Sequence, residues 1–360
     1  MRSKITRLQR RGAFFFCLAL GSLILSNCST QELEFIDPYE FINNDFDGIG
    51  DLPAVNDPEM SFSEPETGEV ADAEETLAII ADVLRAASGE DITSQTLTSL
   101  ERVSVFAESL PASVMEKAES LDALAVANLL DPETTLPANL ADLQVALADV
   151  SSDIAQLLSQ IVLSVDFERF RAANAAIKAP SVYVNPTDVL AQSLVGPCAD
   201  AANSAYAEVT TTLRGQRDAQ LATVEANYSR RILEADARYT ARLALHAEDL
   251  QVNIDEIAAT ITQLLDAATH SDSIGEPEIA EELRILALFY TIEARTALMT
   301  WNDLVLELLE NVLAEEKAAI QERRVLVTTE VTANFNAAKV QADAILTNSL
   351  NDCHNQGSGN

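Results

Sequence analysis

The chain has 360 residues, of which 57 are acidic and 23 are basic, so its formal net charge at neutral pH is −34. Such a charge repels nucleic acids, which excludes them as partners, and it attracts basic proteins and divalent cations. Only three histidines are present, and the sequence contains no GxSxG, no HExxH and no glycine-rich phosphate loop. We therefore expect a protein that is not an enzyme.

Residues 1–27 have the organisation of a secretory signal peptide. Five basic residues, the last of which is Arg11, precede an apolar run from Ala13 to Leu25 that is too short for an ordinary membrane span. The run ends in the sequence LSNC, which resembles the lipobox of bacterial lipoproteins. The resemblance implies cleavage before Cys28, diacylglycerol on its sulfur and an acyl chain such as palmitate on its new amino group. Conventional cleavage without lipid is the alternative.

The residue after the cysteine is Ser29. In lipoproteins of this kind, a residue other than Asp at that position implies sorting to the outer membrane, on its periplasmic or its cell-surface face. The membrane would then be contacted through the N-terminal lipid. Cleavage removes five of the 23 basic residues and none of the 57 acidic ones, which leaves the mature chain with a net charge of about −39.

Residues 28–75 are predicted to form a disordered acidic tether. Between Gln31 and Glu75 there is no lysine or arginine, and four prolines interrupt the sequence. The segment has too little apolar surface to fold alone. As a flexible chain it would reach about 35–40 Å from the membrane.

A short part of this tether, NNDFDGIGD at residues 43–51, resembles the calcium loops of thrombospondin type 3 repeats and dockerins. Oxygen atoms at alternate positions, with a glycine for the sharp turn, are what Ca²⁺ requires. The resemblance implies that Asn43, Asp45, Asp47 and Asp51 would be the side-chain ligands. The alternative interpretation is an acidic linker with a turn. We expect no other cofactor.

The region 76–179 is rich in alanine and leucine and is predicted to be a bundle of helices. The predicted helices are Thr76–Ala87, Ser94–Ser109, Ala112–Leu130 and a fourth from Ala138 towards Ala176. The fourth carries apolar residues at helical spacings of three and four: Leu140, Leu143, Leu147, Val150, Ile154, Leu157 and Ile161. A connector with three prolines follows at 180–197.

Residues 198–353 are predicted to form a long antiparallel helical hairpin. The only obvious helix breaker in this part, SIGEPE at 273–278, places Gly275 and Pro277 where a helix end and a helix start need them. On both sides of it, residues on one face recur at spacings of four, four and three. A repeat of eleven residues in three turns implies a nearly straight or weakly right-handed coil. Each arm would have roughly 75 residues and a length of about 110 Å.

Cys198 and Cys353 lie equally far from this breaker, so the hairpin brings them to the same end. An even pair of cysteines in an oxidising compartment argues for a disulfide, with two unpaired thiols as the alternative. Residues 354–360 would be a disordered tail. His246 falls on the face that forms the seam of the coil, where a polar residue can set the register.

Between Ile279 and Leu313 apolar residues occur on more than one face of the helix. A two-helix coil buries only one seam, so a second surface has to be covered there. The N-terminal helices are the economical candidate, and self-association into a homo-oligomer is the other. The predicted fold is therefore all-α, with a long antiparallel hairpin and an N-terminal helical bundle packed on its distal half.

These features favour a helical spacer or scaffold that binds other envelope or extracellular proteins. The alternative is a module that binds an apolar ligand or a client polypeptide, as tentacled periplasmic chaperones do. Those chaperones are typically basic and carry no lipid, whereas this chain is acidic.

Overall fold

The computed structural model describes residues 41, 45–86, 90–132, 134–148, 150–162 and 196–356. Cys28, Asn43, the signal peptide and most of the connector lie outside these ranges, and the predictions made for them stay predictions. The chain divides into two compact units. The first unit comprises Met1–Asp57, Tyr183–Glu225 and Val325–Asn360, and the second comprises Pro58–Val182 and Ala226–Arg324.

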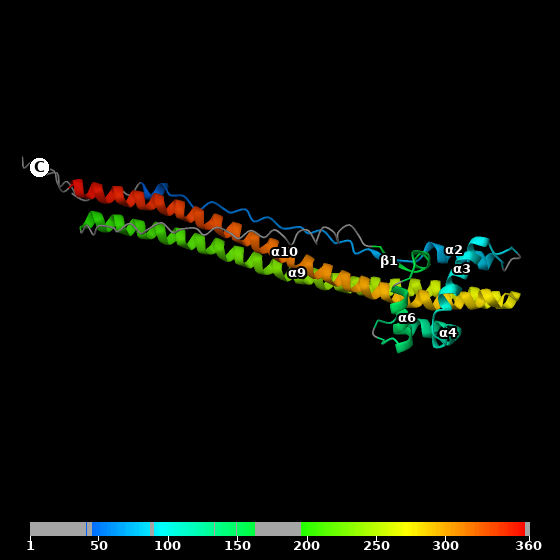
Figure 1. Ribbon diagram of the computed structural model, residues 1–360. Coiled ribbons are helices and arrows are strands. Elements are labelled where there is room, and N and C mark those ends of the chain that lie inside the picture. Colours follow the sequence, from blue (N-terminus) through cyan, green and yellow to red (C-terminus); the bar gives the residue numbers. More distant parts are fainter. Residues whose placement is uncertain are drawn as a thin grey trace, which may run out of the picture. The chain divides into compact units, whose positions relative to one another are not determined.

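Two long helices, α9 (Pro197–Ile274) and α10 (Pro277–Gln356), pack antiparallel as a hairpin (Figure 1). The turn between them is a Schellman motif. Gly275 has a φ of 90°, its N–H donates to the carbonyl of Asp272, and the N–H of Glu276 donates to the carbonyl of Ser271. Pro277 then begins α10, as predicted. Among the described residues, no helix is both long enough and apolar enough to cross a membrane.

The predicted eleven-residue repeat is visible in the burial of both long helices. Along each helix one position in eleven is buried throughout, in the first unit as in the second. On α9 these residues are Ala202, Leu213, Val224, Ala235, His246, Ile257 and Ala268. On α10 they are Ala287, Leu298, Leu309, Ile320, Val331, Ala342 and Cys353.

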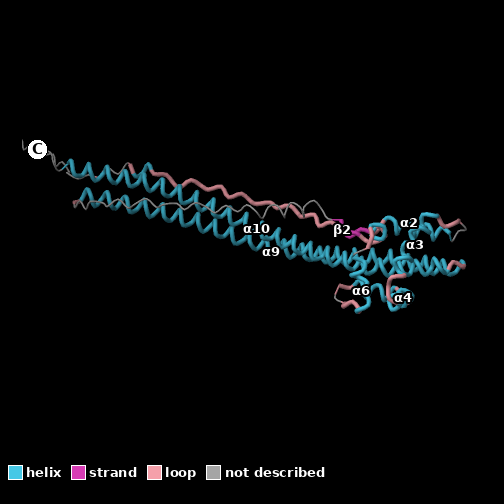
Figure 2. The backbone as a smooth tube through the Cα atoms, in the orientation of Figure 1, coloured by secondary structure: helices cyan, strands magenta, loops and turns pink. Residues whose placement is uncertain are grey.

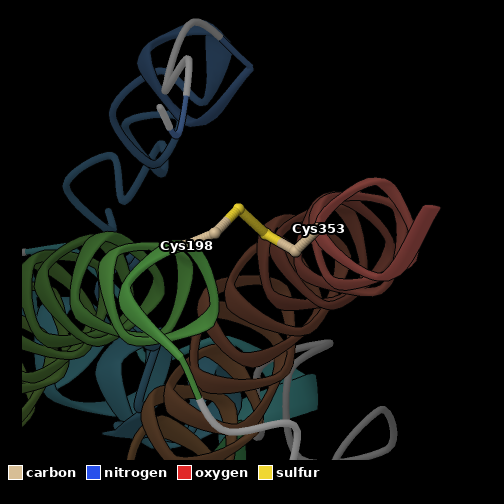
Figure 3. Close-up of a disulfide and its surroundings, with 2 residues drawn as sticks. All are labelled: Cys198 and Cys353. Carbon is tan, nitrogen blue, oxygen red and sulfur yellow. A yellow bond between two sulfur atoms is a disulfide. The ribbon is translucent and has the colours of Figure 1, made fainter. Parts of the chain in front are cut away.

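In the first unit a disulfide joins the ends of the two helices. The Cα atoms of Cys198 and Cys353 lie 5.8 Å apart, and Figure 3 shows the bond between their sulfur atoms. This confirms the predicted pairing. Behind the disulfide, small alanines on α9 pack against leucines on α10 in a narrow apolar seam.

The N-terminal segment of the first unit is packed on this seam, so the prediction of a disordered tether over 28–75 is wrong for its described part. A short 3₁₀ helix, η1 (Phe46–Gly48), places the side chain of Phe46 among apolar residues of α9 and α10. Leu52 packs against Leu213 and Phe335 in the same way. Isolated apolar side chains that cannot form a core of their own still bury themselves when a coil offers them a groove.

The second unit contains six short helices and a two-stranded antiparallel sheet within its described residues. The helices are α2 (Glu74–Ala86), α3 (Ser94–Ala107), α4 (Ala112–Glu119), α5 (Ala123–Leu130), α6 (Ala138–Ala148) and α7 (Ser152–Ala155). The strands β1 (Glu69–Ala71) and β2 (Gln160–Val162) pair with Val70 opposite Ile161 (Figure 2).

One apolar core joins these short helices to α9 and α10. Phe289, Tyr290 and Trp301 of α10 are fully buried in it. Phe106 of α3 packs edge-on against Phe289, with ring centroids 5.4 Å apart. The second apolar surface of α10 is therefore covered by the N-terminal helices, as predicted.

Two predicted helices are shorter than expected. The helix predicted over Ala112–Leu130 is two helices, because Asp122 accepts a hydrogen bond from the N–H of Ala125 and starts α5 there. The fourth predicted helix ends at Ala148. In the region where this helix was predicted to continue, the backbone of Gln160–Val162 pairs with β1 instead. The apolar stripe of the fourth prediction is nevertheless buried at Leu140, Leu143, Leu147, Ile154 and Leu157.

Asp82 of α2 fastens the start of α3. Its carboxylate accepts hydrogen bonds from the N–H and the hydroxyl of Thr93, at 2.9 and 2.7 Å, and from the guanidinium of Arg85 at 3.1 Å. Burial by itself would raise the pKa of Asp82, but the bonds from Thr93, Thr96 and Arg85 outweigh it and lower the pKa.

Replacing both cysteines, Cys198→Ser with Cys353→Ser, is expected to destabilise the first unit. The disulfide closes a loop of 155 residues, for which the chain-entropy account gives about 5 kcal/mol. Thermal unfolding followed by circular dichroism should show a lower Tm, and the wild-type chain in reductant should unfold like the variant. Equal Tm values for oxidised, reduced and variant protein would contradict this.

Asp82→Asn is expected to lower the free energy of unfolding at pH 7 by about 1–3 kcal/mol, because it weakens a buried acceptor of charged hydrogen bonds. The folded-state pKa of Asp82 lies below its unfolded value, so its contribution is present above pH 3.8 and is lost as pH falls through the folded-state pKa. Urea unfolding at several pH values should therefore show the two proteins converging in acid. A difference that is constant with pH would contradict the assignment.

Candidate functional site: the strap on helix α9

In the second unit, residues 58–68, here called the strap, lie extended beside α9. The N–H of Leu52, before the strap, and that of Val70, after it, donate to side chains of α9 within their own units. From Leu52 to Thr67 every second or third residue is at least half-buried and all others are exposed. The covered residues are Leu52, Val55, Asp57, Met60, Phe62, Pro65 and Thr67. Their spacings alternate between three and two, which is a repeat of five.

A five-residue repeat in an extended chain matches the eleven-residue repeat of α9. Five extended residues advance about 16.5 Å at about 3.3 Å each. Eleven helical residues advance about 16.5 Å at 1.5 Å each. Strap residues that are five positions apart are therefore expected to contact residues of α9 that are eleven positions apart.

The charged contacts of the strap follow this match. Glu59 and Glu64 are five residues apart, and they pair with Arg231 and Arg242, which are eleven apart. The Nε of Arg242 lies 2.6 Å from a carboxylate oxygen of Glu64. Glu59 also receives a 2.5 Å hydrogen bond from Arg230.

Three further contacts hold the strap on the long helices. The guanidinium of Arg238 lies 4.8 Å from the ring centroid of Phe62, in a cation–π arrangement. The carbonyl of Pro58 accepts a 2.9 Å hydrogen bond from Arg231, and the carbonyl of Thr67 accepts one of 3.1 Å from the indole of Trp301. The backbone as well as the side chains of the strap is thus recognised.

Burial is unequal across these ion pairs. The side chains of Arg231 and Arg242 are 5% exposed, whereas those of Glu59 and Glu64 are 72% and 68% exposed. The strap therefore covers the arginines, while its own carboxylates stay in water.

Glu316 of α10 holds two arginines of α9 from the opposite side. Its oxygens lie 2.6 Å from Arg238 and 2.8 Å from Arg242. Burial alone would lower the pKa of Arg242, but its hydrogen bonds to Glu64 and Glu316 outweigh that effect and raise the pKa. Glu316 thus orients both guanidinium groups from within the coil.

Beyond the strap, Asp72 anchors the chain to both long helices. It accepts hydrogen bonds from the hydroxyls of Thr260 and Tyr290, at 2.6 and 2.5 Å, and the Tyr290 hydroxyl in turn accepts the N–H of Ala73. Burial, followed by the hydrogen bond to Asp72, raises the pKa of Tyr290. The strap therefore ends at a fixed point in the core.

Of the residues predicted to bind calcium, the structure describes Asp45, Asp47 and Asp51. Asp51 accepts a hydrogen bond from the side chain of Gln216, and Asp47 lies exposed in η1. No group of three or more His, Cys, Asp or Glu residues in the described ranges is placed to hold a metal ion. Asn43 lies outside those ranges, and the calcium loop stays a prediction.

His246 occupies the seam, as its place in the repeat predicted. Its Nε2 lies 2.9 Å from the amide oxygen of Asn302, and its ring centroid lies 4.9 Å from that of Trp301. The imidazole fills the core next to the indole that binds the strap. Its contacts are those of a packed polar residue in a coil.

A cavity of about 470 Å³ lies between α3, α4 and the first turns of α10. Its lining combines apolar side chains with a glutamate cluster. Among the lining residues are Leu110, Met115, Ile285, Glu108, Glu278, Glu281 and Glu282. Burial and then the neighbouring carboxylates of Glu278, Glu281 and Glu101 raise the pKa of Glu282. Such a lining suits a cationic group better than an apolar molecule.

Searches of protein families, of curated proteins and of solved structures found no match to this chain. The sequence did not predict the strap, because residues 28–75 were interpreted as a disordered acidic tether with a calcium loop in it. The signal that could have revealed it is the spacing of the apolar residues in the strap and on either side of it: Leu52, Val55, Met60, Phe62, Pro65 and Val70.

Glu64→Gln is expected to loosen the strap, because it removes one of the carboxylates that the described residues place against the buried Arg242. We expect a loss of about 1 kcal/mol in local stability. Hydrogen exchange of residues 58–68 should accelerate in the variant. The matched control is Glu69→Gln, which makes the same charge change at an exposed side chain of β1. Equal exchange in the two variants would contradict the role of Glu64.

Glu282→Gln is expected to raise the Tm at pH 7. The folded-state pKa of Glu282 is raised, so its carboxylate destabilises the fold above that pKa and ceases to do so as pH falls below the ordinary value of 4.5. The gain in Tm should therefore vanish near pH 4. Glu116→Gln, at an exposed position of α4, is the control and should leave the Tm unchanged. A gain that persists in acid would contradict the prediction.

Proposed function

We propose that this protein is a non-enzymatic helical scaffold of the bacterial envelope, held at the outer membrane by a lipid on Cys28. The observation that supports the proposal most is the self-sufficient packing of the hairpin. The apolar faces of α10 around Phe289, Tyr290 and Trp301 are filled by the chain's own short helices. In the first unit a disulfide joins α9 to α10. Such a body can hold other proteins at its surface without changing its own core.

The surface offers positions for such contacts. Large apolar side chains of α3, α5 and α6 are exposed, among them Val105, Leu124 and Val145. Charged residues are also exposed. A surface that mixes such charges with a few apolar side chains suits interfaces that are only partly apolar. The acidic surface fits basic partners best.

The second candidate function is binding of an apolar ligand or a client polypeptide. The cavity beside Met115 is the feature that favours it. Its glutamates argue against an apolar ligand, because burying a carboxylate next to one is costly. The buried apolar side chains of this unit pack against one another in the core and do not line the cavity as a continuous apolar surface. The scaffold is therefore the better supported function.

Photo-crosslinking in cells tests the proposal. A photoreactive residue at Leu124 or Val145 should give discrete protein adducts, whereas one at the buried Leu129 should give none. Cys28→Ser should release the protein from the membrane fraction and abolish the adducts. A lipid that co-purifies with the protein, or protection of an unfolded client from aggregation, would support the second function instead. Retention of the Cys28→Ser chain in the membrane would contradict the lipid anchor.

A further inference from the structure

The strap covers a basic island in a strongly acidic protein. Arg230, Arg231, Arg238 and Arg242 lie within thirteen residues of α9, in a chain whose net charge is −34. The strap supplies Glu59 and Glu64 to this island. Charge complementarity therefore selects an acidic segment at this face.

We propose that the face of α9 that carries these four arginines is a recognition site for an extended acidic segment. In a single chain, that chain's own strap occupies the site. When this strap is displaced, the strap of a second copy occupies the site instead. A second copy is the partner because its strap carries the same charges at the same five-residue spacing. The inference is independent of the scaffold function, since it concerns only contacts of the strap.

We expect the arginine side chains of this face to keep their orientation when the strap is released. Glu316 belongs to α10 and pairs with Arg238 and Arg242 without involving the strap, so we expect both guanidinium groups to stay oriented when the strap is released. A site that is organised before binding loses less entropy when its ligand arrives.

The strap also has a pivot. Gly68 has a φ of 71°, a conformation that favours glycine, and it is the last residue of the strap, directly before β1. Because β1 is paired with β2, and Asp72 is bound to Tyr290, the chain after Gly68 can stay in place while the strap swings away.

The experiment uses the full chain carrying Glu59→Lys and Glu64→Lys, which turns both strap carboxylates into cations facing arginines. Hydrogen exchange should show the strap released, and circular dichroism should show the helices retained. A fluorescent peptide of residues 57–71 should then bind this variant at least tenfold more tightly than it binds the wild-type chain. The binding should weaken steeply with salt.

Two controls test the recognition rule. A peptide with one serine inserted between Ser61 and Phe62 keeps all the original residues and their charge but breaks the five-residue spacing, and should bind at least tenfold more weakly. The variant alone should be monomeric, because its own strap is disabled, and it should form a mixed dimer with the wild-type chain on light scattering.

Four results would overturn the proposal. Unchanged strap protection in the variant would show that the carboxylates do not hold the strap. No peptide binding to a released face would show that the face is not a recognition site, and equal binding of the inserted peptide would remove the spacing rule. Peptide binding without a mixed dimer would show that the second copy is not the partner.

Discussion

The structure depends on the eleven-residue repeat that α9 and α10 share. It keeps one face of each helix buried over many turns, from Ala202 to Ala268 and from Ala287 to Cys353. Because the repeat is close to the natural period of an α-helix, it can continue without the strong supercoil of a heptad coil. The same period, about 16.5 Å along the axis, equals five residues of extended chain. One constraint thus accounts for both the seam and the strap.

Charge explains why a strap so poor in apolar residues stays on the helix. Its carboxylates are exposed, so ion pairing costs them little hydration, while Arg231 and Arg242 are buried with the strap in place. A buried cation without a counter-ion is strongly unfavourable. Glu316 and Glu64 of the strap both balance the positive charge of Arg242. The bond to Glu64 links the acidic N-terminal segment to the coil.

Much of the fold could be predicted from sequence because its signals are periodic and local. Gly275 and Pro277 marked the turn, the spacing of Cys198 and Cys353 indicated the disulfide, and apolar residues on several faces of α10 indicated a cover. The break at Asp122 was missed although its cap is a local contact to Ala125, whereas the break beyond Ala148 was missed because the pairing of β2 with β1 forms only through tertiary contact. The strap was missed for a related reason. Its binding depends on arginines some 170 residues away in the chain.

Amide hydrogen exchange of the oxidised, full-length protein tests the central claim most directly. The N–H groups of Leu52, Val70 and Ala73 are bonded to side chains of the long helices, Gln216, Asn253 and Tyr290. The docked segment predicts slow exchange at these three amides, together with fast exchange at exposed positions such as Ser63. Uniformly fast exchange from residue 51 to 73 would show a free tether and would contradict the match between strap and helix.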